Sequence, residues 1–152
     1  MKARIASVLA ASAVAAAGMT AAAAPAATAG VLGGECGAGY SLVGLHKVGN
    51  QHTDKIDLHM EVYYSASAKR NCLISRHAGD AYGEVRETHA RIRPSGAAWP
   101  SCNSTGCDYG NYAYYAGPVY TPAGVDMSHR CVDIAGYAGI QVDKILYNQH
   151  CG

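Results

Sequence analysis

The clearest alternation of hydrophobic and polar residues runs from Lys55 to Tyr64. Every second position in it is apolar or aromatic: Ile56, Leu58, Met60, Val62 and Tyr64. The intervening positions are Asp57, His59, Glu61 and Tyr63. Successive side chains of a strand point to opposite faces, so this pattern predicts a β-strand with one buried and one exposed face.

A second strand is expected to follow directly. Ser65 to Asn71 is a polar segment typical of a turn, and the chain becomes apolar again over Cys72 to Arg76. The two segments predict a β-hairpin whose loop is longer than a two-residue turn.

Further short apolar segments are bounded by Gly, Pro, Asn or Asp. They are Tyr40 to Val48, Val85 to Arg93, Tyr109 to Tyr120, and Ile140 to Tyr147. This spacing predicts an all-β fold, a small disulfide-linked antiparallel sandwich or barrel of about six to seven strands. A short helix is the alternative for Ile140 to Tyr147, because its apolar residues also fit a helical face.

The N-terminal residues have the pattern of a secretory signal peptide. Lys2 and Arg4 precede an uncharged apolar run from Ile5 to Ala17, and Ala27-Thr28-Ala29 is a small-x-small cleavage site. The run is shorter than the roughly 20 residues of a membrane span. We therefore expect residues 1–29 to be a signal peptide and residues 30–152 to be one secreted domain, with no membrane association after cleavage.

Cleavage changes the charge balance of the chain. Removing Lys2 and Arg4 from the 12 basic residues leaves 10 against 11 acidic ones, for a formal net charge of −1. Non-specific binding to nucleic acid depends on a basic surface, so no nucleic-acid partner is expected. The densest basic stretch, Arg86 to Arg93, also contains Glu87 and is interpreted as a solvated strand face.

All six cysteines fall in the predicted secreted domain: Cys36, Cys72, Cys102, Cys107, Cys131 and Cys151. An even number in an exported chain favours disulfides. Cys102 and Cys107 flank a short polar turn and are paired first, which leaves Cys36 with Cys72 and Cys131 with Cys151 as sequential pairs. Zinc binding is the alternative role for the cysteines. The Cys102-x4-Cys107 spacing has no matching second pair of ligands, so no metal is expected.

Tyrosine supplies most of the aromatic volume, since the chain has 11 tyrosines, one tryptophan and no phenylalanine. If Tyr109 to Tyr120 is one strand, Tyr112, Tyr114 and Tyr120 share one face. Tyr115 and Val119 then point to the core. The row of three tyrosines is a candidate binding surface for sugar rings, and covering the sheet is its alternative role. Pro118 predicts a sheet edge or a bulge at this end of the strand.

No motif for catalysis is present in the chain. The sequence lacks a GxSxG serine, a P-loop and a dinucleotide-binding fingerprint. A glycosidase needs only two suitably separated carboxylates, and no particular pair is indicated. We expect no catalytic residues and no cofactor.

Several segments resemble the spore-associated protein A family of small secreted actinobacterial proteins. The similar segments are Tyr115-Ala116-Gly117-Pro118-Val119-Tyr120, Cys131-Val132-Asp133 with Gly136, Cys36-Gly37-Ala38-Gly39-Tyr40, Asn71-Cys72, and Cys151. Cys102, Cys107 and Ile134 depart from the family pattern. The resemblance implies export and association with the spore or aerial-cell surface, and it brings no catalytic residues.

Three functional hypotheses follow from these patterns. The favoured one is a structural protein of the spore or cell surface. The second is a module that binds extracellular or cell-wall glycan through exposed tyrosines. The third is a secreted enzyme or enzyme inhibitor, for which a rigid loop between Cys102 and Cys107 would be the inhibitory element.

Overall fold

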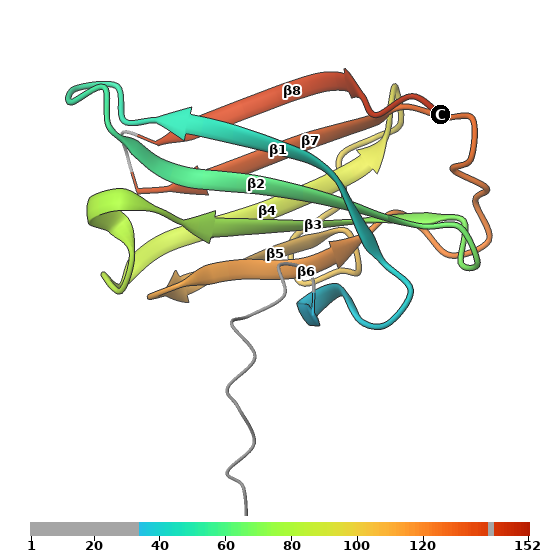
Figure 1. The fold of residues 1–152 in the computed structure, drawn as a ribbon, viewed down its shortest axis with the longest axis horizontal. Helices are drawn as coiled ribbons and strands as arrows, with labels where there is room; N and C mark the ends of the chain where they lie inside the picture. Colours follow the sequence, from blue (N-terminus) through green and yellow to red (C-terminus); the bar gives the residue numbers. More distant parts are fainter. Residues whose placement is uncertain (1–33, 140–141) are drawn as a thin grey trace, which may run out of the picture.

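The computed structural model describes residues 34–139 and 142–152, and the predicted signal peptide lies outside the described residues. Two four-stranded antiparallel sheets make up most of the described chain (Figure 1). The strands are β1 (Ser41–Gly49), β2 (Ile56–Ser65), β3 (Arg70–His77), β4 (Arg86–Pro94), β5 (Cys107–Tyr112), β6 (Tyr115–Tyr120), β7 (Val132–Ala138) and β8 (Asp143–Gln149). The predicted all-β, disulfide-linked fold is confirmed, with one strand more than the upper expectation.

The two sheets pack face to face. The first has the strand order β1-β2-β3-β6 and the second has the order β5-β4-β7-β8. β2 contacts β7 and β3 contacts β4 across the interface between them. Only residues 113–114 separate β5 from β6, so the chain passes there from one sheet to the other.

The predicted hairpin is confirmed as β2 and β3. Their pairing extends from Ser65 opposite Arg70 to Leu58 opposite His77. Residues 66–69 form the connecting turn.

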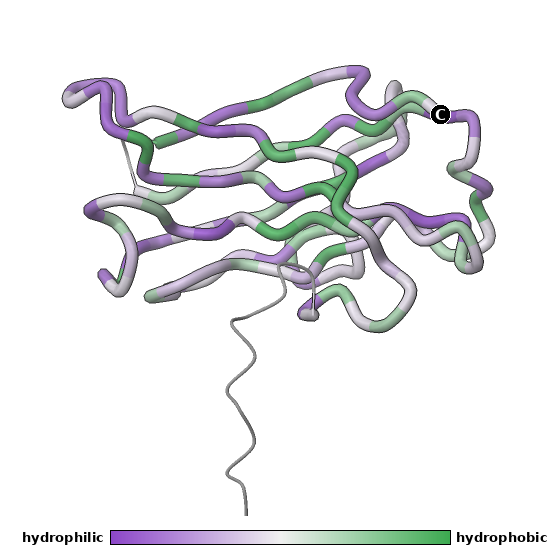
Figure 2. Tube along the Cα trace, viewed as in Figure 1, coloured by the Kyte–Doolittle hydropathy of each residue, from purple (hydrophilic) through white to green (hydrophobic). Residues whose placement is uncertain are grey.

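The larger of two apolar clusters lies between the sheets, and Figure 2 shows hydrophobic and hydrophilic residues along the strands that enclose it. Its larger members include Leu58, Met60, Val62, Leu73, Ile92 and Ile134. Gly136 on β7 allows the close approach of β2, because a Cβ at this position would lie 2.7 Å from the Met60 side chain. Close packing of the core therefore requires glycine at position 136 as well as the apolar side chains.

The second face of β2 is buried, so the prediction of an exposed face is wrong. Asp57, Glu61 and Tyr63 are each at most 3 % exposed. The 3-10 turn η2 (Gly79–Ala81) packs against β2, and the Ala78 N–H donates to the Asp57 carbonyl at 2.8 Å. The alternation of residues along one strand does not indicate whether another part of the chain packs over its polar face.

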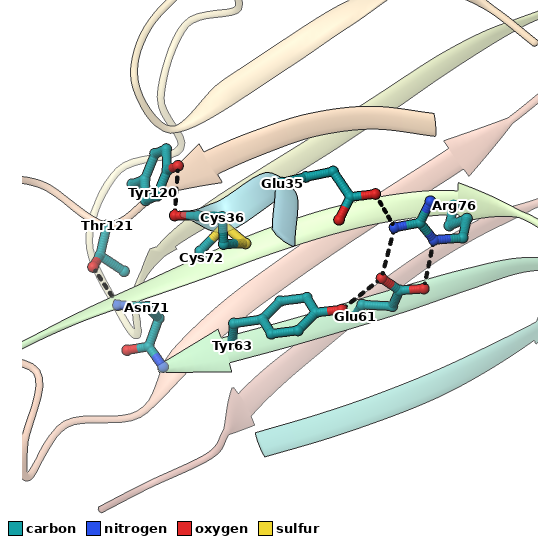
Figure 3. Close-up of a disulfide and its surroundings, with 9 residues drawn as sticks. All are labelled: Glu35, Cys36, Glu61, Tyr63, Asn71, Cys72, Arg76, Tyr120 and Thr121. Carbon is teal, nitrogen blue, oxygen red and sulfur yellow. Dashed lines mark hydrogen bonds and ion pairs between the residues drawn. A yellow bond between two sulfur atoms is a disulfide. The ribbon is translucent and has the colours of Figure 1, made fainter. Parts of the chain in front are cut away.

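The rest of this cover is the 3-10 turn η1 (Gly34–Cys36), shown in Figure 3. Arg76 on β3 donates to Glu35 at 2.9 Å and to Glu61 at 2.8 Å, and so connects η1 to β2. The Tyr63 hydroxyl donates to Glu61 at 2.8 Å. Burial and this hydrogen bond to a carboxylate raise the pKa of Tyr63 above its ordinary value, so the hydroxyl stays a donor.

The segment from Tyr109 to Tyr120 is two strands in different sheets, so its prediction as one strand is wrong. Within β6, Ala116 and Val119 belong to the central core, whereas Tyr115 and Tyr120 pack against the outer cluster of Cys36, Tyr63, Cys72 and Ile74. Tyr115 and Val119 therefore point to opposite faces.

A bulge in β6 explains this arrangement. Two residues of β6, Gly117 and Pro118, lie opposite the single residue between Leu73 and Ser75 of β3. The extra residue breaks the period of two on which the face assignment depended. The expectation that Pro118 marks an edge or a bulge is confirmed, since β6 is also an edge strand.

The strand predicted over Ile140 to Tyr147 is confirmed, since Asp143–Gln149 is the strand β8 and the helical alternative is not adopted there. Residues 140–141 of the predicted segment lie outside the described residues. The strand β7 has no counterpart among the predicted strands. It lies between β4 and β8 and is almost wholly buried, so its sequence lacks the alternation of a half-exposed strand.

Three disulfides join Cys36 to Cys72, Cys102 to Cys107, and Cys131 to Cys151, the pairs that the spacing predicts. The first attaches η1 to β3, and the second closes the loop that precedes β5. The third attaches the C-terminal segment to the residue before β7.

Candidate functional site

The three tyrosines predicted to form a row are not brought together. Tyr112 and Tyr114 lie beside the turn from β5 to β6, whereas Tyr120 lies at the opposite end of β6. The Tyr120 ring packs edge-to-face on Tyr40 at 5.7 Å between centroids, and its hydroxyl donates to the Cys36 carbonyl at 3.1 Å. Tyr120 therefore holds the N-terminal turn in place (Figure 3).

An exposed aromatic pair forms instead from Tyr82 and Tyr114. Their rings meet edge-to-face with centroids 5.2 Å apart, and the residues are 61% and 51% exposed. Tyr82 follows η2 in the loop before β4, where no periodic pattern marks a surface residue, and sequence reasoning missed it. We refer to Tyr82, Tyr112, Tyr114 and Tyr115 as the tyrosine surface.

A cavity of about 410 Å³ lies beside this surface and is lined by Asp108, Tyr112, Ala113, Tyr114, Tyr115 and Gly117. The Tyr112 hydroxyl and the Gly117 N–H each donate to Asp108 at 2.7 Å. The hydrogen bond to Asp108, with a smaller effect of burial, raises the pKa of Tyr112 to about 12. The hydroxyl therefore stays protonated at neutral pH and fixes its ring beside the cavity.

The tyrosine surface has the chemistry of a sugar-stacking site. Exposed aromatic faces can pack against the apolar C–H face of a sugar ring, and hydroxyl and carboxylate groups accept or donate hydrogen bonds at its edge. Tyr112 and Tyr114 also lie where β5 and β6 connect, so both roles named for the predicted row stay predictions for this surface.

Two of the buried carboxylates, Glu61 and Asp133, are engaged in structural ion pairs. Glu61 accepts from Arg76, and Asp133 on β7 accepts from Arg93 at 2.9 Å. Asp133 also accepts from the Ser95 hydroxyl at 2.7 Å and from the backbone N–H groups of Gly96 and Asn148 at 3.3 and 3.0 Å. Burial acts to raise the pKa of Asp133, but these hydrogen bonds outweigh it and hold the pKa below its usual value. Asp133 thus ties β4, β7 and β8 together as an ionised group.

The loop closed by Cys102 and Cys107 is tied to both sheets. The Thr105 carbonyl accepts from the Tyr120 N–H at 2.7 Å, and the Gly106 carbonyl accepts from the Ile92 N–H at 2.9 Å. An inhibitory loop presents its backbone to a protease, whereas these two carbonyls are already bonded within the domain.

Within residues 34–139 and 142–152, no group of three or more His, Cys, Asp or Glu side chains is placed to hold a metal ion. The same residues contain no helix that is long and apolar enough to cross a membrane. Comparisons with protein-family models, with curated proteins and with solved structures find no match to this chain. The functional argument therefore rests on the geometry above.

Proposed function

We propose that this chain is a secreted protein with a structural, non-catalytic role at the spore or cell surface. The observation that carries the proposal is the placement of the disulfides. One attaches the first described turn to the middle of a sheet, and another attaches the C-terminal segment to the start of β7. Fraying of chain ends is the usual first step of local unfolding and proteolysis. Covalent attachment of the first and last described segments suits a protein that persists outside the cell, where disulfides are stable.

The buried carboxylates support a non-catalytic role. Glu61 and Asp133 each face an arginine and further donors rather than a second carboxylate. A glycosidase requires two carboxyl groups that face the same bond with different pKa values. These ion pairs stabilise the fold.

Fractionation of the producing cells tests this proposal. We expect the protein in the washed spore or cell-wall fraction and in the medium, where an antibody and added protease can reach it without lysis. A matched chain without residues 2–29 is expected to remain inside the cells. Recovery of the unaltered chain only from the soluble interior would contradict the proposal.

The second candidate function is binding of extracellular or cell-wall glycan, favoured by the exposed Tyr82 and Tyr114 pair. A pull-down with insoluble peptidoglycan tests it. Binding is expected to fall about tenfold or more for the Tyr82→Ala and Tyr114→Ala double variant, since each stacked ring contributes to affinity. Tyr147→Ala removes a comparably exposed ring from β8 and should leave binding unchanged.

The row predicted from Tyr112, Tyr114 and Tyr120 is tested in the same experiment. Replacing Tyr120 should reduce folding rather than binding, because its hydroxyl and ring hold Cys36 and Tyr40. If all folded tyrosine variants bind as the parent does, the tyrosines have only a structural role.

A further inference from the structure

A larger cavity lies at the other end of β6, away from the tyrosine surface. It has a volume of about 710 Å³ and is enclosed by the loop after β4 and the loop after β6, residues 95–106 and 121–130. The volume falls within the range of roughly 300 to 1,000 Å³ that is typical of small-molecule sites. We refer to it as the arginine cavity.

The wall of the arginine cavity is largely apolar. It includes Ile92, Pro94, Ala97, Pro100, Pro122 and Val125. No aspartate or glutamate is among the described residues that line the cavity. A ligand that enters it meets hydrophobic surface and cationic side chains, without a competing carboxylate in the lining.

The loop after β4 is held in place by stacking. The Trp99 ring stacks with two arginines of β4, with the guanidinium carbons of Arg91 and Arg93 at 5.1 and 4.1 Å from its centroid. Arg91 also donates to the Pro100 carbonyl at 3.0 Å. These contacts hold the loop that contributes Ala97 and Pro100 to the lining in the absence of a ligand, and preorganisation lowers the entropic cost of binding.

Three arginines line the cavity, and they differ in their partners. Arg93 is neutralised by Asp133. Arg70 stacks on Tyr120 at 5.1 Å and donates twice to the Thr121 carbonyl, at 2.9 and 2.6 Å, but has no carboxylate partner among the described residues. Arg130 is exposed, and its side chain makes no hydrogen bond or ion pair within the described part of the chain, although its backbone N–H donates to the Met127 carbonyl at 3.3 Å.

Two positive charges at the cavity therefore lack a counter-ion. The nearby carboxylate of Asp126 does not supply one, since it is bound by Lys69 at 2.7 Å. Guanidinium groups bind carboxylates and phosphates with directed, charge-assisted hydrogen bonds. An anionic group on a ligand would complete the charge balance that the chain leaves open.

We propose that the arginine cavity binds a small amphipathic anion. Its carboxylate or phosphate is held by Arg70 and Arg130, and its apolar part lies against Ile92, Pro100 and Val125. This site is separate from the tyrosine surface, and the proposal does not depend on the function proposed above.

A set of ligands with the same alkyl chain and different headgroups tests the proposal. Octyl phosphate, octanoate, octanol and octyltrimethylammonium are titrated into the purified protein below their micelle concentrations, with calorimetry and NMR shifts as readouts. At least one anion is expected to bind, with shifts at Tyr120 and Val125, and to bind about tenfold or more tightly than the alcohol, as a charged hydrogen bond predicts. The two anions distinguish phosphate from carboxylate as the preferred group.

Substitutions assign the binding to this cavity. Arg130→Gln is expected to weaken binding of the preferred anion about tenfold without affecting the fold, because Arg130 has no partner to lose. Ala123→Trp fills the cavity from an exposed position and should abolish binding. Lys144→Gln removes an exposed cation from β8 and is the charge-matched control. The proposal is overturned if neither anion binds, if octanol binds as tightly as both, or if Arg130→Gln and Lys144→Gln have equal effects.

Discussion

The Nε2 atoms of His46 and His150 lie 2.9 Å apart, so one N–H···N hydrogen bond joins β1 to the segment after β8. β1 and β8 are edge strands of different sheets, on the side of the sandwich away from the β5 and β6 connection. The His150 ring fits there because position 44 is glycine. A Cβ on Gly44 would lie 1.9 Å from the ring Cε1 atom.

Gly44→Ala should therefore destabilise the domain by about 1 to 3 kcal/mol, the usual cost of forcing an extra methyl group into a packed site. Urea denaturation measures the change. Gly49→Ala on the same strand is the control, because the nearest atom to its Cβ would be 3.8 Å away. Equal losses for the two variants would show that the His150 ring is not packed against β1.

Stability should decrease as the pH falls below about 6.5, the ordinary histidine value. Burial lowers the pKa of both His46 and His150. The neighbouring His46 lowers the pKa of His150 further. Burial also lowers the pKa of His77, although hydrogen bonds to the Ala113 and Ala81 carbonyls oppose this effect. A lowered pKa in the folded state means that the unfolded chain binds more protons, so the stabilisation is complete above pH 6.5 and is lost below it.

Denaturation midpoints measured over roughly pH 8 to 5, the range in which histidine titrates, give this dependence. His150→Gln should reduce the loss on acidification, since it removes one of the two rings that would become charged side by side. His129→Gln, at an exposed position, is the control. A midpoint that does not change over this range would contradict the burial argument.

Tyr115→Ala should cost more stability than Tyr114→Ala. The Tyr115 ring packs against the outer cluster under the Arg76 guanidinium, whose central carbon is 5.1 Å from the ring centroid. We expect a loss of about 2 to 4 kcal/mol for Tyr115→Ala, by analogy with other aromatic truncations. Tyr114 is exposed, and its loss should cost less than about 1 kcal/mol. Thermal denaturation of both variants measures the difference, and equal losses would exclude this packing.

The Cys102 and Cys107 disulfide should matter least for stability. It closes a sequence separation of 5 residues, against 36 for Cys36 and Cys72. Loop-closure entropy predicts a loss of about 2 kcal/mol for the paired serine substitutions at positions 102 and 107, and about 4 kcal/mol for those at 36 and 72. The second pair is also buried, which increases its cost. Denaturation of the two double variants compares them, and the reverse order would contradict the loop-length argument.

Local pattern predicted the parts of this fold that depend on neighbouring residues. The β2 and β3 hairpin follows from alternation and a polar turn, and the cysteine pairs follow from spacing. The burial of Glu61 and Tyr63 could not be predicted in this way. The turn η1 that covers them lies more than 20 residues earlier in the chain, and alternation within a strand does not detect such distant contacts.

The candidate sites were harder to predict for the same reason. The bulge at Gly117 and Pro118 reverses the faces within β6. A strict period of two therefore assigned Tyr115 and Tyr120 to opposite faces, although both pack against the outer cluster. Loop packing brings the Tyr82 ring into contact with Tyr114. It also places Arg130 in the lining of the same cavity as Arg70. Pro118 was a usable signal of irregularity, whereas the loop contacts have no local sequence signal.

The intact mass of protein extracted from washed spores or cell walls, measured without reduction, tests whether the chain is secreted and disulfide-linked at the surface. We expect a chain that begins at or within a few residues of Gly30 and lacks the six hydrogens removed by three disulfides. Reduction should then restore these six hydrogens. A chain that retains Met1, or one with free thiols found only inside the cells, would contradict a secreted, disulfide-linked role at the surface.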